Sequence, residues 1–178
     1  MKVAPSLVTH FFAGWHDLLT ATYDLLAERF ITQLAPILAR DFPTARARMD
    51  AVIRYYLGID GAGANTMGAN IAFWQLSRSV LDLKAAFGRF LADRQCMLRD
   101  VLAGLAVESG ANIALDDMTA CLILMMDGLW LEMSLNPGGI AEQRALQMCW
   151  AWIDAVIGRP SSGASATPAA LTGRSESG

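Results

Sequence analysis

The chain has 178 residues, 54% of them hydrophobic and 17% charged, with a formal net charge of −3. This composition predicts one sizeable hydrophobic core with apolar surface left over for an oligomer, and the negative charge argues against a protein that binds nucleic acid over its whole surface. The three cysteines (Cys96, Cys121 and Cys149) form no CxxC pair, so no disulfide framework or cysteine zinc site is expected, and a reducing cytoplasm suits them.

The N-terminal part of the chain predicts two helices. Pro5 begins a short one that runs through Phe11, because proline suits the first turn of a helix, and an Ala-Gly pair ends it. A long helix is predicted over residues 17–40, where apolar side chains recur at intervals of three and four. Pro36 is expected to kink this long helix or to end it early.

The middle of the chain predicts three further helices, over residues 44–57, 66–83 and 84–107. Thr44 follows a proline and is expected to cap the first of them. The loop at residues 58–65 contains glycines but follows a helix rather than a strand, so a phosphate-binding loop is not favoured. The charged side chains of the last helix are interpreted as mixed-sign pairs on a solvated face: Arg89, Asp93, Arg94, Arg99 and Asp100.

Two strongly apolar helices end the predicted fold, over residues 118–135 and 140–157. Asp116 and Asp117 are expected to act as cap and first-turn acids of the first, and an Asn-Pro-Gly-Gly run ends it. Residues 158–178 are rich in Gly, Ser, Ala and Pro and are expected to form a disordered tail. No strand pattern occurs in the sequence, so the predicted fold class is all-α.

The helix over residues 118–135 is apolar nearly all round and must therefore be covered on most sides. A membrane is the less favoured cover, because the uncharged run at residues 119–126 is far shorter than the roughly 20 residues that a span needs. A partner chain is favoured, with two helices from each subunit forming a four-helix bundle in a cytoplasmic homodimer. The predicted interface residues are Leu122, Met126, Gly128, Leu129, Met133, Met148 and Trp152.

Asp127 is the electrostatic oddity of this helix. Two interpretations stay open: a hydrogen-bonded carboxylate at a helix edge, or the counter-charge of a cation in a ligand pocket. Trp130 lies three residues later on the same face, and an indole beside an acid suits a cationic ligand. The predicted ligand pocket is mainly apolar and consists of Trp74, Phe90, Met125, Asp127 and Trp130.

Motifs for catalysis are missing from the sequence. The two histidines, His10 and His16, both lie near the N-terminus, and no HExxH, GxSxG or paired cysteine motif occurs. An enzyme is therefore not expected, nor are catalytic residues, a metal site or a cofactor.

Residues 1–19, MKVAPSLVTHFFAGWHDLL, resemble the second half of the helix-turn-helix head of TetR-family transcriptional regulators. Val3, Phe12 and Leu18 match the valine, phenylalanine and leucine of the family pattern, and residues 5–10 match its recognition helix. The resemblance implies DNA contacts from Pro5, Ser6, Thr9 and His10.

The C-terminal part resembles the ligand-binding domain of the BetI-like branch of that family. The similar segments are FWQLSRSV around Trp74, LADRQCMLRDVL, and MMDGLWLEMSL at residues 125–135. The resemblance covers residues 3–157 and implies a dimeric repressor in which a small-molecule effector changes the spacing of the two heads and releases the operator. BetI-like repressors respond to choline, so a small cation such as choline is one effector that the resemblance suggests.

The head also departs from the family pattern. The first two helices have no counterpart in the sequence, and Trp15 stands where a phosphate-contacting lysine is expected. The expected organisation is a helix-turn-helix remnant at residues 1–13, a ligand-binding and dimerisation domain at 14–157 and a tail at 158–178. Operator DNA is an expected partner if the head is completed upstream; the alternative is a ligand-binding and dimerisation module that does not bind DNA.

Overall fold

The computed structural model describes residues 12–59, 67–136 and 138–158, and this part of the chain holds six α-helices and no strand. In chain order they are α2 (Trp15–Ala39), α3 (Ala45–Leu57), α4 (Met67–Leu76), α5 (Leu81–Ser109), α6 (Leu115–Leu135) and α7 (Glu142–Ile157). The predicted all-α fold is confirmed. The predicted short N-terminal helix, the tail beyond residue 158 and the predicted DNA contacts lie outside the described residues; those contacts are Pro5, Ser6, Thr9 and His10.

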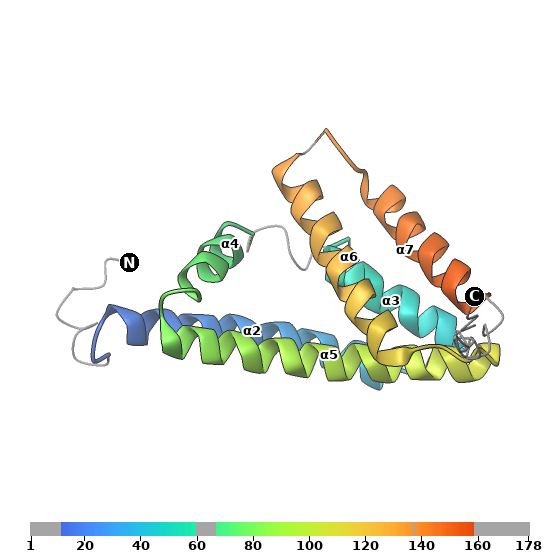
Figure 1. Ribbon diagram of the computed structural model, residues 1–178, viewed down its shortest axis with the longest axis horizontal. Helices are drawn as coiled ribbons and strands as arrows, with labels where there is room; N and C mark the ends of the chain where they lie inside the picture. The colour runs from blue at the N-terminus through green and yellow to red at the C-terminus, as the bar shows by residue number, and fades with distance from the viewer. Residues whose placement is uncertain (1–11, 60–66, 137, 159–178) are drawn as a thin grey trace, which may run out of the picture.

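Two packed groups of helices share the long helix α5 (Figure 1). α2 and α5 lie side by side along the length of the molecule, α4 stands at one end of this pair, and α6 and α7 rise together at the other end beside α3. The smaller core cluster joins α2, α4 and α5 through Tyr23, Phe73, Val80, Leu83 and Ala86. The larger cluster lies mainly among α3, α5, α6 and α7 and includes Ile53, Leu98, Leu102, Leu122, Met126 and Cys149.

α2 runs without a break from Trp15 to Ala39, so Pro36 does not end the helix early. Pro36 lies on the exposed side of the last turn, and the helix ends within three residues of it. Arg40 then takes up an extended backbone, with its N–H donating to the carbonyl of Ile37 at 3.4 Å. A proline removes the hydrogen bond to the carbonyl four residues earlier, here that of Thr32. Because Thr32 and Pro36 are both exposed, water can replace the missing donor and the helix continues through the proline.

The boundary between α4 and α5 differs from the prediction. Helix was expected up to residue 83, but α4 ends at Leu76 and α5 begins at Leu81. In the turn between them, the hydroxyl of Ser77 donates to the carbonyl of Trp74 and the hydroxyl of Ser79 to that of Leu76. Serine side chains that bond to nearby backbone compete with helix formation, which explains a break that apolar periodicity does not reveal.

The helix starts show one confirmed cap and one corrected cap. Thr44 caps α3 as predicted, because its hydroxyl accepts the N–H of Ala47 at 3.0 Å. α6 begins at Leu115, so Asp116 and Asp117 lie in its first turn and neither is its N-cap. Asp116 instead accepts a hydrogen bond from the exposed guanidinium of Arg99 at 2.6 Å.

α6 is long and apolar enough to cross a membrane by length and composition alone, with a mean hydropathy of 1.4 over its best window. The uncharged run at residues 119–126 is much shorter, because Asp127 and Glu132 interrupt the apolar sequence without ending the helix. The helix packs against α3, α5 and α7 as a core element, yet only 33% of that window is buried within the chain. The rest of its apolar surface is free to contact another molecule.

Candidate ligand-binding site and apolar surface

A buried ion pair joins the middle of α5 to the middle of α6. Arg94 Nη1 lies 2.8 Å from Asp127 Oδ1, and Nη2 lies 2.8 Å from Oδ2, so the two side chains meet fork to fork. The side chain of Arg94 is 9% exposed and that of Asp127 is 29% exposed. Asp127 is thus a hydrogen-bonded carboxylate at a helix edge, the first of the two interpretations from the sequence.

The interpretation of Arg94 as part of a solvated face is wrong. Arg94 lies in the apolar stripe of α5, four residues after Phe90 and four before the buried Leu98. The sequence held a signal that was missed: an arginine in line with core positions needs an acid beside it. Asp127 supplies that acid from another helix, 33 residues later in the chain.

Two buried donors beside this pair have no hydrogen-bond partner among the described residues: Arg94 Nε–H and the hydroxyl of Tyr56. The guanidinium carbon of Arg94 lies 6.0 Å from the ring centroid of Tyr56 and 5.7 Å from that of Phe90. Burial raises the pKa of Tyr56, with smaller opposing effects from the charges of Arg94 and Asp127, so its hydroxyl stays protonated and can donate.

The neighbouring Tyr55 behaves differently. Its hydroxyl donates to the carbonyl of Phe30 at 2.8 Å, although both tyrosines are buried and adjacent in α3. The ring of Phe30 also contacts the rings of Tyr56 and Phe90, with centroids 5.2 and 5.4 Å away. Aromatic rings from α2, α3 and α5 therefore contact one another beside the guanidinium of Arg94.

The predicted pocket residues are only partly brought together. Phe90 contacts Arg94, and Trp130 lies one turn beyond Asp127 and packs against Trp74 of α4, with ring centroids 6.3 Å apart. Met125, by contrast, packs against the larger core cluster. That these side chains line a ligand pocket stays a prediction.

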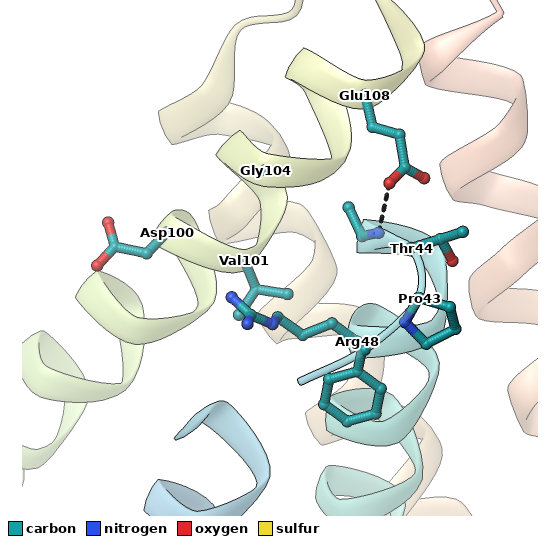
Figure 2. Close-up of a pocket in the computed structure, with 9 residues that line it drawn as sticks. Pro43, Thr44, Arg48, Asp100, Val101, Gly104 and Glu108 are labelled. Carbon is teal, nitrogen blue, oxygen red and sulfur yellow. Dashed lines mark hydrogen bonds between the residues drawn. The ribbon is translucent and has the colours of Figure 1, made fainter. Parts of the chain in front are cut away.

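A cavity of about 250 Å³ lies elsewhere, between the start of α3 and the second half of α5 (Figure 2). It contains none of the predicted pocket residues. Its charged lining residues have opposite signs: Arg48, Asp100 and Glu108. Glu108 accepts the backbone N–H of Ala45 and so stabilises the first turn of α3, where an acid is favourable. The charge of Glu108 thus stabilises the packing of α3 on α5.

The predicted dimer interface needs a correction. Leu122, Met126 and Leu129 are buried within the chain itself, so they cannot contact a partner. The opposite stripe of α6 is exposed instead: Leu124 is 70% exposed, and a Cβ on Gly128 would meet no atom within 4 Å. We define the apolar surface of α6 and α7 by its exposed and half-buried members, which are Leu124, Gly128, Leu131, Leu135, Met148 and Trp152. Of the predicted interface residues, Met133 and Trp152 are half-buried and also pack against the larger core cluster.

Comparison with known proteins gives three findings. The family model described as the C-terminal domain of BetI-type transcriptional repressors matches residues 45–158. A transcriptional regulator from Pseudomonas aeruginosa PAO1 has a similar crystal structure, with 26% identity and a TM-score of 0.78 over 86% of this chain and 74% of that one. A TetR transcription regulator from Haloarcula marismortui ATCC 43049 shares the fold at 18% identity, with a TM-score of 0.74 over 86% of this chain and 85% of that one. No curated protein matches the sequence.

Proposed function

The chain belongs to the TetR family of transcriptional regulators, with a C-terminal domain of the BetI type, and on this premise we propose that it is a ligand-responsive repressor. In this proposal the protein is a cytoplasmic homodimer that binds operator DNA when no effector is bound. A small-molecule effector binds among the helices of each subunit. It stabilises the conformation of the dimer that does not bind DNA, and the operator is released. No enzymatic step is part of this function.

The observation that carries the effector-binding part is the polar centre around Arg94 and Asp127. It links α5, which packs along α2 and α3, to α6, which carries the exposed apolar surface. An effector that changes the contact between α5 and α6 would shift α6, with its exposed apolar surface, against α5 and α2. Two buried donors at this junction have no partner among the residues that the structure describes, which supports the proposal, since such groups are rare in native proteins and are often functional.

We propose that the apolar surface of α6 and α7 forms the dimer contact. Two helices from each subunit would then make a four-helix bundle around a two-fold axis, in which the same residues face one another. Gly128 would let the two copies of α6 approach closely, because its position has open space and no side chain. The sparse burial of α6 within one chain supports this arrangement.

The three cysteines provide a check on the dimer. Cys96 and Cys121 are exposed in the single chain, whereas Cys149 is buried and its burial raises the pKa of its thiol to about 11. Cys121 lies one turn before Leu124 on the same stripe of α6. In the native dimer we expect a thiol reagent to modify Cys96 quickly, Cys121 slowly and Cys149 only on unfolding, because thiolates react and buried thiols stay protonated. If Cys121 reacts as fast as Cys96 in peptide mapping by mass spectrometry, this stripe is not covered.

The hydrogen bonds of Asp127 bear on whether the effector is a small cation. A small cation such as choline would need the charge of Asp127, but both carboxylate oxygens of Asp127 accept hydrogen bonds from Arg94. A cation would therefore have to displace Arg94 and leave a buried guanidinium without its partner, which is costly. The geometry therefore favours an effector that does not compete with Arg94 for Asp127.

In vitro selection from random duplex DNA tests the repressor function. From a chain whose helix-turn-helix head is completed upstream we expect recovery of a palindromic operator with half-sites about one helical turn apart, and release of that DNA by a bound effector; residues 1–178 alone should bind DNA without sequence preference. The alternative, a ligand-binding and dimerisation module without DNA contact, is favoured by one observation. Trp15 is 68% exposed at the start of α2, where the resemblance places a phosphate-contacting lysine, and an indole cannot neutralise a phosphate. Recovery of no preferred sequence by the completed chain would support that module.

A further inference from the structure

We propose that the effector of this regulator is a neutral molecule with an aromatic or similarly apolar body and one hydrogen-bond-accepting oxygen, such as a ketone or ester carbonyl. Its oxygen would be held by Tyr56 and Arg94 beside Asp127. This inference rests on the proposed function, because it names the chemistry of the effector that would bind there.

Two unpaired donors favour a ligand that carries an acceptor. The Tyr56 hydroxyl and Arg94 Nε–H are buried side-chain donors without an acceptor in the described part of the chain, on residues only 8% and 7% exposed. A buried donor without a partner is costly, so an acceptor brought by a ligand gains binding free energy there. A carbonyl oxygen has two lone pairs and can accept from both donors.

The charges of Arg94 and Asp127 favour a neutral ligand. Arg94 and Asp127 already neutralise each other through two hydrogen bonds of 2.8 Å. A carboxylate ligand would bring an uncompensated negative charge to the pair, and a quaternary ammonium has no acceptor for either donor. A neutral acceptor satisfies the donors and leaves the ion pair intact.

Aromatic rings lie beside the site. The rings of Tyr56 and Phe90 each contact Phe30, and the guanidinium carbon of Arg94 lies 6.0 Å from the Tyr56 centroid and 5.7 Å from the Phe90 centroid, so the part of a ligand beyond its oxygen meets aromatic surface. The side chain of Asp127 keeps 29% of its surface exposed, so the ion pair lies at the edge of the core, whereas the two donor atoms are buried. A ligand that reaches the donors must therefore displace side chains packed at this edge.

Two neighbouring tyrosines allow a test that needs no ligand. Tyr56→Phe removes a hydroxyl without a partner, so the melting temperature should stay unchanged or rise. Tyr55→Phe removes a hydroxyl that donates to Phe30, so the melting temperature should fall by about 2–4 °C. A fall of similar size in Tyr56→Phe would show that its hydroxyl is bonded within the protein, and the proposal would be overturned.

Three aromatic probes of similar size test the ligand class: acetophenone (a neutral carbonyl), benzoate (an anion) and benzyltrimethylammonium (a cation). In calorimetric titrations of the full chain we expect acetophenone to bind at least tenfold more tightly than the other two, and Tyr56→Phe to remove that preference while Tyr55→Phe keeps it. Preference for the ammonium, or a preference for acetophenone that Tyr56→Phe leaves unchanged, would overturn the proposal. Effector-controlled DNA binding would still stand in that case, whereas a failed DNA selection would leave the probe preference intact.

Discussion

Leu124→Glu is expected to convert the dimer into a folded monomer. Leu124 is 70% exposed in the single chain, so the substitution should leave the fold of one subunit unchanged. At a two-fold interface it would bury two carboxylates without partners, one from each subunit. We expect the dimer dissociation constant to rise by at least about 100-fold, measured by light scattering and sedimentation at micromolar concentration.

Two further variants separate loss of the dimer from loss of the fold. Gly128→Glu should act like Leu124→Glu, because it places a carboxylate on the same exposed stripe. Leu129→Glu should unfold the chain instead, because Leu129 is buried within its own subunit. A wild-type protein that is monomeric at micromolar concentration, or a Leu124→Glu variant that stays dimeric, would show that this face of α6 is not the interface.

Helices α6 and α7 show what the hydrophobic periodicity of a sequence can and cannot predict. The sequence revealed that α6 is apolar on two stripes and that both need cover, but it did not reveal which stripe faces the chain itself. Leu122 and Leu124 are equally apolar, and only the packing of α3, α5 and α7 decides that Leu122 is buried while Leu124 is exposed. Three of the predicted interface residues, Leu122, Met126 and Leu129, therefore lie on the face that packs against the chain itself, and the use of α6 and α7 as the dimer contact stays a prediction.

At the ion pair of Arg94 and Asp127, the sequence predicted one partner and not the other. Asp127 was visible as an isolated acid in an apolar helix, and its bonded state was one of the two open interpretations. Arg94 was hidden among the other charged residues of α5, because local sequence shows pairs three or four residues apart and not partners on separate helices. The unpaired donors could not be predicted from the sequence, because whether a buried donor has a hydrogen-bond partner depends on how the side chains around it pack.

Asp127→Ala is expected to destabilise the protein by about 3 kcal/mol, because it leaves the guanidinium of Arg94 buried without its partner. This is the low end for a broken buried pair, since the Asp127 side chain is 29% exposed and water can partly replace it. Asp127→Asn should cost less, because the amide oxygen still accepts one hydrogen bond. Urea unfolding at a fixed protein concentration measures both effects and keeps the contribution of dimerisation constant.

The double variant Arg94→Met with Asp127→Leu provides the control. Replacing a whole buried pair by apolar side chains of similar size removes the need for a partner, so stability should return to within about 1 kcal/mol of the wild type. Binding of acetophenone should nevertheless be weakened, because one of its two donors is gone. The pair would then be retained for recognition rather than for stability. If Asp127→Ala costs less than about 1 kcal/mol, or if the double variant is as unstable as the single one, Arg94 does not depend on Asp127 for its buried position.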